Sequence, residues 1–257
     1  MEATVPAVRL LLPPSEGKTA PSGGAPVDLA GLSFPELTRR RERLLAELEK
    51  VSRGRELRAL DLLGLSPGQS GELERNATLR EAPAAPASEV YTGVLYERAR
   101  LSDLPDERAR ARAERCVLIF SALWGVLAPG DRIPAYRFSS GARLPKAGSP
   151  AAFWRPALAK ALADDGLIVD VRSGSYAAAW KPQAATVLAV RSFVEAPDGS
   201  RKPISHMAKA ARGDVTRALL LAPAEPETPA DVAAIAEAAG LRVELQATTL
   251  DVIVPAT

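Results

Sequence analysis

The chain has 257 residues, and 47% of them are hydrophobic, which is enough apolar surface for the core of one large domain or two small ones. Its 33 basic and 31 acidic side chains leave a formal net charge of only +2, so the total charge does not by itself indicate a nucleic-acid-binding protein. One Cys and one His exclude an internal disulfide and the usual zinc and iron–sulfur ligand sets. We therefore expect no metal site and no cofactor.

Short runs rich in leucine and β-branched residues predict strands, and these runs alternate with helical segments. The predicted strands are 8–12, 117–120, 167–171, 186–194 and 242–248. The predicted helices are 34–53, 104–115, 149–162, 207–222 and 228–240. This alternation predicts an α/β protein with a single compact domain over 1–257, in which helices wrap a central mixed sheet.

Membrane insertion is not expected from the sequence. No stretch reaches the roughly 18 uninterrupted apolar residues that a membrane helix requires, and the longest candidate, 118–130, is stopped by Pro129 and Gly130. The opening residues lack the cationic region that precedes the apolar run of a secretory signal. We expect a cytoplasmic protein with no membrane partner.

Charge is distributed unevenly along the chain. Residues 39–58 carry 8 basic and 4 acidic side chains, and residues 129–217 carry 14 and 7, whereas residues 218–257 carry 1 and 6. Attraction to a polyanion depends on local potential, so both basic blocks are candidate contact surfaces for nucleic acid. The alternative is that both blocks are ordinary solvated faces.

The first candidate site is the loop LPPSEGKT at 12–19, which follows the first predicted strand. Ser15, Lys18 and Thr19 offer two hydroxyls and a cation at a strand end, where α/β folds commonly bind anions. A Walker A loop is excluded because Leu12 stands where its first glycine is required. The partner motifs of Ser-x-x-Lys acyl-transfer enzymes are also absent from the sequence. The loop is either an anion site or an ordinary polar turn.

The second candidate is residues 57–75, which predict two short helices joined by a hairpin. Gly64 is suited to end the first helix and Ser66 to cap the second, with Pro67 in its first turn and Gly68 in the hairpin. A helix-hairpin-helix element points backbone N–H groups at one spot and favours a phosphate without reading a base. Helix pairs of this kind are also common packing units, so both interpretations stay open.

The third candidate is a set of polar residues beside Gly or Pro at predicted element ends, where functional side chains usually gather. If the loops that carry them converge, five cations from distant segments form a cationic cleft. The complete predicted cleft for DNA or a small anion comprises Ser15, Lys18, Thr19, Glu89, Tyr91, Arg137, Lys181, Lys209 and Arg212. We assign no catalytic residue among them.

Five sequence blocks, in order between residue 8 and about 220, carry a family resemblance. They are Ser15-x-x-Lys18-Thr19, Glu89 to Gly93, Trp124 to Asp131 with Ala135-Tyr136-Arg137, Phe153-Trp154, and Ala208 to Gly213. Together they resemble the bacterial peroxide stress protein YaaA family. The resemblance implies one α/β domain with a sheet wrapped by helices, a helix-hairpin-helix element and a positively charged cleft. It also implies a role in hydrogen peroxide resistance, in limiting damage from unincorporated iron, and in binding double-stranded DNA.

Two functions follow from these observations. The leading hypothesis is a cytoplasmic peroxide stress protein that binds double-stranded DNA non-specifically through the cleft and the hairpin. The alternative is an enzyme that acts on a phosphorylated or carboxylated small molecule in the same cleft, with Glu89 as the carboxylate for proton transfer. An open groove favours DNA and a deep closed pocket favours the enzyme. We favour the binding protein.

Overall fold

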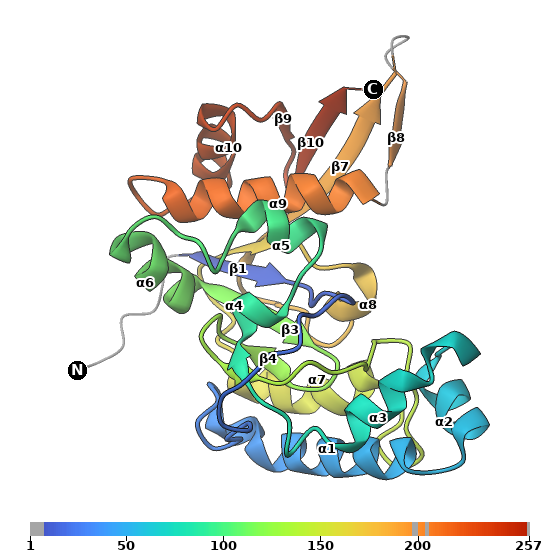
Figure 1. Ribbon diagram of the computed structural model, residues 1–257. Helices are drawn as coiled ribbons and strands as arrows, with labels where there is room; N and C mark the ends of the chain where they lie inside the picture. The colour runs from blue at the N-terminus through green and yellow to red at the C-terminus, as the bar shows by residue number, and fades with distance from the viewer. Residues whose placement is uncertain (1–7, 197–199, 204–205, 256–257) are drawn as a thin grey trace.

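A mixed β-sheet forms the centre of the computed structural model, which describes residues 8–196, 200–203 and 206–255 (Figure 1). Its strands are β1 (Val8–Leu12), β3 (Val117–Ser121), β4 (Gly125–Leu127), β6 (Leu167–Asp170), β7 (Thr186–Glu195), β8 (Arg201–Pro203), β9 (Val243–Leu245) and β10 (Thr249–Pro255). In the described residues the strand order is β4-β3-β1-β6-β7-β10-β9, and β8 pairs with β7. The five strands from β3 to β10 in this order are mutually parallel, whereas β4, β8 and β9 are antiparallel to their partners.

Helices surround this sheet and make the protein a single compact α/β domain, as predicted. They are α1 (Thr38–Ser52), α2 (Glu56–Leu63), α3 (Gly71–Ala77), α4 (Ala87–Val90), α5 (Val94–Ala99), α6 (Glu107–Cys116), α7 (Pro150–Ala161), α8 (Gly174–Ala177), α9 (His206–Leu221) and α10 (Pro229–Ala238). In Figure 1, α9 and α10 lie in the upper part of the molecule with β7, β9 and β10, and α1, α2 and α3 form the lower part. Among the described residues, no helix combines the length and apolar character needed to cross a bilayer.

Short 3-10 helices and a two-stranded ribbon complete the fold. The 3-10 turn η1 (Pro35–Leu37) precedes α1, and η2 (Pro67–Gln69) lies between α2 and α3. The ribbon pairs β2 (Ala85–Pro86) with β5 (Arg132–Ile133). The predicted helix 34–53 therefore begins later, at Thr38, because Phe34 adopts a left-handed conformation and Pro35 starts a 3-10 turn.

Local capping signals place several helix boundaries. Thr228 caps α10 as predicted: the N–H of Asp231 donates to its hydroxyl at 3.2 Å, and the Asp231 carboxylate accepts from the Thr228 N–H at 2.9 Å. Asp106 caps α6 by accepting from the Ala109 N–H at 2.7 Å, so this helix begins at Glu107. These side chains satisfy N–H groups that have no partner within the helix.

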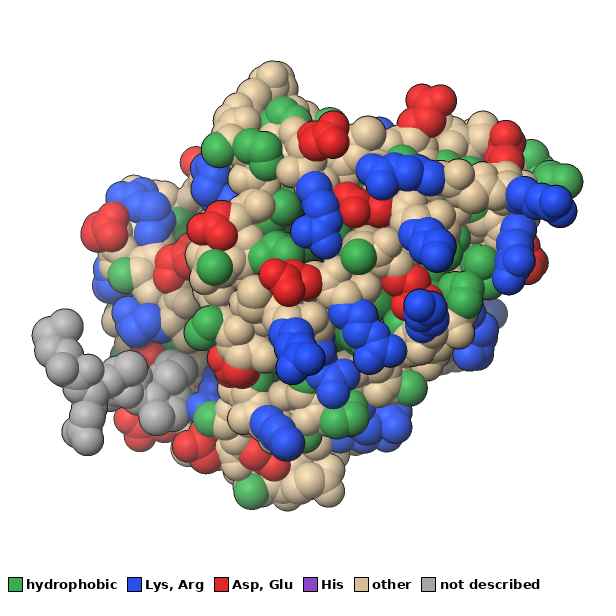
Figure 2. Space-filling model, turned by 90° about the horizontal axis from the view of Figure 1, so that it is seen from below, with side chains coloured by type: hydrophobic (Ala, Val, Ile, Leu, Met, Phe, Trp, Pro, Cys, Tyr) green, Lys and Arg blue, Asp and Glu red, His purple; other side chains and the backbone are tan. Residues whose placement is uncertain are grey.

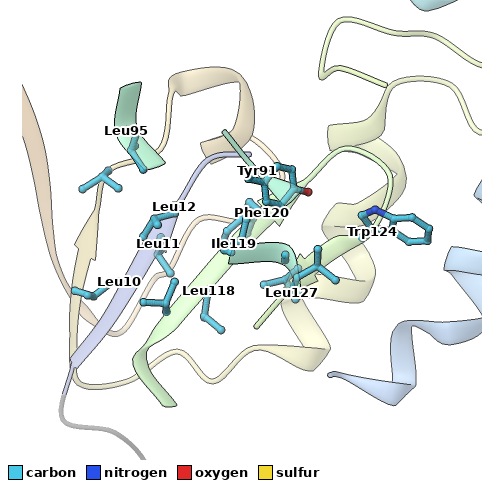
Figure 3. Packing of buried hydrophobic residues seen from close by; sticks show 14 of the residues in the cluster. Leu10, Leu11, Leu12, Tyr91, Leu95, Leu118, Ile119, Phe120, Trp124 and Leu127 are labelled. Atoms are coloured by element: carbon cyan, nitrogen blue, oxygen red, sulfur yellow. The ribbon is translucent and has the colours of Figure 1, made fainter. Parts of the chain in front are cut away.

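The core is built on the two most buried strands. Every residue of β1 and β3 is buried, which explains why both segments have nearly continuous apolar sequences. Figure 3 shows Leu10, Leu11 and Leu12 of β1 packed beside Ile119 and Phe120 of β3. The polar residues of these two strands are Ser121 and Arg9, and Arg9 forms an ion pair with Asp165 at 2.7 Å.

The strand order reverses direction at the carboxyl end of β1, and we call the region there, between the loops that follow β1 and β6, the crevice. In the sheet, β1 lies between β3 and β6. The next parallel strand after β1 in the chain is β3, on one side, whereas the next strand after β6 is β7, on the other side. Loops that leave neighbouring parallel strands toward opposite sides open a crevice at the carboxyl ends, and α/β proteins usually bind ligands there. In Figure 1 the arrowhead of β1 points toward α8, which follows β6. The predicted anion loop therefore lies at this crevice.

Candidate functional site in the crevice and on the basic face

The loop 13–19 is held in place by the segment that follows α4. The Thr19 N–H donates to the Val90 carbonyl at 2.9 Å, and Lys18 forms an isolated antiparallel bridge with Tyr91. Gly93 has a φ of +97°, and a Cβ there would lie 3.0 Å from the Ser15 hydroxyl. Glycine is thus required for the close approach of the two loops, and the loop is a fixed structure.

Lys18 carries its amine against two aromatic rings. Its Nζ lies 4.3 Å from the centroid of the Tyr136 ring and 5.5 Å from that of Tyr91. The same amine donates to the carbonyl oxygens of Ser15 at 2.6 Å and Glu16 at 3.4 Å. Burial lowers the pKa of Lys18 to about 8, against a smaller opposing effect of the Glu16 charge. The amine is therefore much easier to deprotonate than that of an ordinary surface lysine.

Arg137 joins this loop to the predicted hairpin. Its guanidinium Nη1 lies 2.7 Å from the Glu16 carboxylate. Its backbone N–H donates to the Asn76 side chain at 2.9 Å, and the Asn76 amide donates back to the Arg137 carbonyl at 2.7 Å. Asn76 belongs to α3, and the charge of its neighbour Arg75 helps lower the pKa of Lys18. The structure thus brings Lys18 and Arg137 together, and the hydrogen bonds of Asn76 hold the hairpin next to Arg137.

A chain of buried hydroxyls lies beneath Lys18. The Tyr136 hydroxyl is 2.7 Å from the Tyr91 hydroxyl and 2.7 Å from Ser121 Oγ. Burial raises the pKa of both phenols, so they stay protonated. Ser121 ends β3 and also accepts from the Trp124 N–H at 3.1 Å. Ser121 was not among the predicted site residues, although a hydroxyl directly after the predicted strand 117–120 was a signal that could have pointed to it.

Tyr176 closes the crevice from the β6 side. It lies on α8, and burial raises its pKa to about 12, with a further upward effect from the Glu16 charge. A hydrogen bond with Ser140 lowers the pKa of Tyr176 and so opposes these two effects. The loops after β1 and β6 are therefore close enough for their polar groups to interact. The sequence analysis did not include Tyr176 among the site residues.

A second polar group lies at the end of β6. Arg172 forms an ion pair with Asp170 at 2.7 Å and stacks over Phe120 at 4.2 Å. The predicted site residue Arg212 belongs with this group: its Nε donates to the Val190 carbonyl at 3.2 Å. Burial lowers the pKa of Arg212, and the Asp170 charge opposes the shift. The sequence signal for Arg172, a cation directly after a predicted strand, was present but was not used.

The remaining predicted cleft residues lie in other surroundings. Glu89 and Thr19 line a cavity of about 380 Å³ together with Arg132. Lys181 and Lys209 are exposed, and no contact in the described part of the chain joins them to Lys18. The nine predicted residues thus fall into several groups, and the group around Lys18 is the densest.

The predicted hairpin residues form a turn between two short helices. Gly64 ends α2 with a φ of +64°, which favours glycine. Ser66 and Gln69 form a capping box around η2, in which the Ser66 N–H donates to Gln69 Oε1 at 3.0 Å. Gly68 lies within η2, and α3 begins at Gly71. The helix–turn–helix shape is present, and its use as a DNA-binding hairpin stays a prediction.

Exposed cations gather on the lower face of the molecule, which is seen from below in Figure 2. A groove of about 680 Å³ between α1, α2 and residues 145–146 has an apolar floor that includes Val51 and Leu62. A hollow of about 630 Å³ adjoins it along α1. Eight cations line the groove and the hollow, and one of them, Arg80, forms an ion pair with Glu49 at 3.1 Å. We define the basic face by the other seven: Arg39, Arg40, Arg43, Lys50, Arg55, Arg58 and Lys146.

The charges of the basic face are not neutralised within the described chain. None of its seven cations forms an ion pair with a carboxylate of the described residues. The Glu47 carboxylate in the same groove is occupied by the backbone N–H groups of Lys146 and Ala147. The face therefore presents a net positive potential to solvent. It corresponds largely to the basic block 39–58 of the sequence.

The thiol of Cys116 is buried where α6 meets β3. Burial raises its pKa to about 11, and the nearby Glu225 charge raises it further. The reactive thiolate is therefore disfavoured. In residues 8–196, 200–203 and 206–255, no three His, Cys, Asp or Glu side chains gather into a group that could hold a metal ion.

Comparison with known proteins decides the family. The model of the peroxide stress protein YaaA family matches residues 8–247, nearly all of the described chain. This chain belongs to the YaaA peroxide stress protein family. The resemblance seen in its sequence blocks is thereby confirmed.

Relatives of this YaaA-family chain share most of its length. A UPF0246 protein of Streptomyces coelicolor, SCO2297, is 45% identical over 241 residues, which cover 93% of this chain and 92% of the relative. The UPF0246 protein CE1889 of Corynebacterium efficiens is 40% identical over 241 residues, covering 92% and 94%. A UPF0246 protein of Corynebacterium glutamicum is 40% identical over 240 residues, covering 91% and 94%.

Proposed function

We propose that this YaaA-family protein binds double-stranded DNA without sequence preference during peroxide stress, and that the basic face is its main contact surface. The observation that carries the proposal is the set of seven cations without ion-pair partners in the described chain, gathered around an open groove on α1 and α2. Duplex DNA carries one phosphate charge about every 1.7 Å along its axis, so a cationic face attracts it strongly. An open groove also fits a duplex better than it fits a small enclosed substrate.

The dimensions of the face support contacts with several phosphates. Helix α1 has 15 residues, and a helix rises 1.5 Å per residue, so it spans about 22 Å. That length matches roughly two-thirds of a turn of the duplex, whose pitch is about 34 Å. Arg and Lys side chains that contact phosphates position a protein on DNA without reading its sequence. The expected binding is therefore strong at low salt and non-specific.

The predicted hairpin adjoins this face and extends it toward the crevice. Helix α2 supplies Arg58 to the groove and ends at Gly64 in the turn. Helix α3 then runs to Asn76, which is hydrogen-bonded to Arg137. In this proposal a duplex that lies on the basic face also reaches the turn, whose backbone N–H groups contact one further phosphate.

The first experiment measures affinity for two short duplexes of unrelated sequence by fluorescence anisotropy at 50 and 200 mM salt. For about four phosphate contacts, the affinity is expected to fall on the order of 100-fold over this range, and equally for both sequences. Absence of binding at 50 mM salt, or an affinity independent of salt, would contradict the proposal.

A pair of charge reversals tests the surface. Arg58→Glu on the basic face is expected to weaken binding at least tenfold at 50 mM salt. Lys202→Glu is the matched control, because Lys202 is also exposed but lies on β8 at the other end of the molecule (Figure 1). Equal effects of the two variants would show that the basic face is not the contact surface. Circular dichroism of both variants confirms that the fold is retained.

A cellular experiment tests the link to peroxide. A strain that lacks the protein is challenged with hydrogen peroxide, and DNA strand breaks are counted. We expect more breaks than in the parent strain, with rescue by the original chain and by Lys202→Glu but not by Arg58→Glu. Full rescue by Arg58→Glu would separate the stress function from DNA binding by this face.

A further inference from the structure

The crevice holds a lysine amine that lies against two aromatic rings and two backbone carbonyls. The Lys18 Nζ is enclosed by the rings of Tyr136 and Tyr91 and by two backbone carbonyls. The nearest acid, Glu16, points its carboxylate at Arg137. Within the described residues, Lys18 therefore has no carboxylate as an ion-pair partner. Its protonated form is held only by carbonyl dipoles and ring faces.

Such surroundings raise the fraction of Lys18 side chains that carry a neutral amine. With a pKa of about 8, roughly a tenth of the Lys18 side chains are neutral at pH 7, against well below a thousandth for a lysine with the ordinary pKa near 10.4. A desolvated lysine next to another cation is the arrangement that activates an amine as a nucleophile toward carbonyl groups. Here Arg137 is that second cation, and its effect on the pKa of Lys18 is in the same direction as burial.

We propose that Lys18 is a nucleophile that forms an imine with an aldehyde bearing a phosphate group. The neutral Nζ attacks the aldehyde carbon and forms a C–N bond. The carbonyl oxygen takes up two protons, which the amine loses, and leaves as water, so a C=N bond remains. No oxidant or reductant is consumed. The reaction is reversible, because water that returns to the imine releases the aldehyde.

The phosphate requirement follows from the cations beside the amine. Arg137 Nε is buried and has no hydrogen-bond partner in the structure, although the Nη1 of the same guanidinium contacts Glu16. Glu16 is more than half exposed, so its side chain is free to turn toward solvent when an anion approaches. Arg75 on α3 adds a second positive charge near Lys18, although it is paired with Glu72 at 2.5 Å, and the Glu72 charge raises the pKa of Lys18. Guanidinium groups bind phosphate oxygens through paired N–H donors.

Two sources supply an aldehyde of this chemistry. One is an abasic site in duplex DNA, where the ring-opened sugar is an aldehyde flanked by phosphates. The other is a free sugar phosphate in its aldehyde form. The abasic-site source rests on the proposed DNA binding, whereas the free sugar phosphate does not. The hydrogen bonds between Asn76 and Arg137 place the hairpin next to the crevice, so in this proposal a duplex on the basic face lies near Lys18.

Reductive trapping tests the proposal with the full chain. The protein is incubated with sodium cyanoborohydride, which reduces an imine to a stable amine, and with one of three probes. The probes are a duplex with a single abasic site, the same duplex intact, and glyceraldehyde 3-phosphate. Intact-mass measurement and peptide mapping then locate the adduct. We expect an adduct at Lys18 with at least one of the two aldehydes and none with the intact duplex.

Matched variants separate Lys18 from other lysines. Lys18→Arg keeps the positive charge but removes the nucleophile, and we expect adduct formation to fall at least tenfold. Lys202→Arg, on β8 and outside both the crevice and the basic face, is expected to leave the adduct unchanged. Mapping on the unmodified chain does not depend on whether Lys18→Arg folds. An adduct distributed over surface lysines, or no adduct with either aldehyde, would overturn the proposal.

The outcomes also separate this proposal from DNA binding. If the intact duplex binds but neither aldehyde is trapped, the imine proposal fails and the proposed function stands. If no duplex binds but glyceraldehyde 3-phosphate is trapped at Lys18, the DNA proposal fails and the crevice is a small-molecule site. Trapping of the abasic duplex alone assigns the amine to damaged DNA.

Discussion

Arg41 and its neighbours on α1 show that one run of similar residues contains side chains with opposite roles. The Arg41 side chain is completely buried, and its guanidinium donates to the carbonyls of Trp124 at 3.0 Å and Val126 at 2.8 Å. Burial lowers its pKa to about 10, with smaller opposing effects of nearby acids. Arg39, two positions earlier, is exposed and belongs to the basic face. Arg41 stabilises the fold, whereas the charge of Arg39 faces solvent.

Substitution of these two arginines should therefore have different effects on stability. Arg41→Met leaves two buried carbonyls without donors, at about 1–3 kcal/mol each, so we expect the free energy of unfolding to fall by about 2–4 kcal/mol. Arg39→Met removes an exposed charge and is expected to change it by less than about 0.5 kcal/mol. Urea denaturation of both variants measures the difference. Equal effects would show that the carbonyl contacts of Arg41 contribute little.

Lys18 gives a prediction for the pH dependence of stability. Its pKa is about 8 in the folded chain and 10.5 ordinarily, so at pH 7 it is mostly protonated in both states and its burial cost is nearly complete. As the pH rises from about 8 to 10.5, the folded state loses the proton first and the cost disappears. The original chain should thus gain stability relative to Lys18→Met, by about 2 kcal/mol between pH 7 and pH 9.5.

Urea denaturation of both chains at pH 7, 8.5 and 9.5 tests this behaviour. Other titrating groups are common to both proteins, so their contributions largely cancel in the difference. A difference that stays constant over this range would mean that Lys18 keeps an ordinary pKa in the folded chain. The imine proposal would then lose its source of neutral amine.

At the scale of elements, α9 approaches α5 more closely than side chains normally allow. A Cβ placed on Gly213 in α9 would lie 2.4 Å from the Leu95 carbonyl and 2.6 Å from the Cβ of Arg98. The two helices are further joined by the ion pair between Arg98 and Asp214, at 2.7 Å. Gly213 therefore sets the spacing between α5 and α9, and α9 in turn covers β7. The sequence pattern assigned this glycine only to a family block.

Gly213→Ala should consequently destabilise the protein, although alanine is the better helix former. The clash is with backbone as well as side chain, so we expect a loss of about 2–3 kcal/mol after the gain in helix propensity. Gly71→Ala in α3 is the matched control, because no heavy atom lies within 4 Å of its added Cβ. This change should stabilise the chain by about 0.5–1 kcal/mol. Thermal denaturation distinguishes the signs, and stabilisation by both substitutions would contradict the close approach.

At the scale of the whole molecule, one sheet connects segments from both ends of the described chain. Strand β1 begins at Val8 and β10 ends at Pro255, and both lie in the same hydrogen-bonded sheet. Charge is arranged along the molecule as well, because the basic face lies at the bottom of Figure 1 and the acidic α10 region at the top. A polyanion is therefore attracted to one end of the protein.

The shared sheet predicts that the chain unfolds as one unit. Strand β1 pairs with both β3 and β6, so its loss would separate β3 and β4 from β6, β7, β10 and β9. We expect near-ultraviolet and far-ultraviolet circular dichroism to give the same urea midpoint. Two separated transitions would instead indicate that the α1–α3 part, which carries the basic face, folds independently of the sheet.

Much of the fold was predictable from the sequence because its signals are local. Continuous apolar runs located β1, β3, β6 and β7, and the Thr228–Pro229 pair located the start of α10. Strand β10 was missed because Asp251 interrupts its apolar pattern. In the structure the Asp251 carboxylate is buried and pairs with Arg191 at 2.6 Å. An acidic residue in a sequence normally indicates an exposed position, but here the ion pair allows it to lie inside the strand.

The sequence by itself determined the alternation of elements, the basic block on α1 and α2, and the family. Only the tertiary structure decided which cations share a site. Asn76 and Arg137 are 61 positions apart, and Arg137 and Glu16 are 121 apart, yet they meet beside Lys18. Helix and strand patterns depend on neighbours a few residues away, whereas burial and the resulting pKa of an amine depend on distant segments that meet only when the sheet forms.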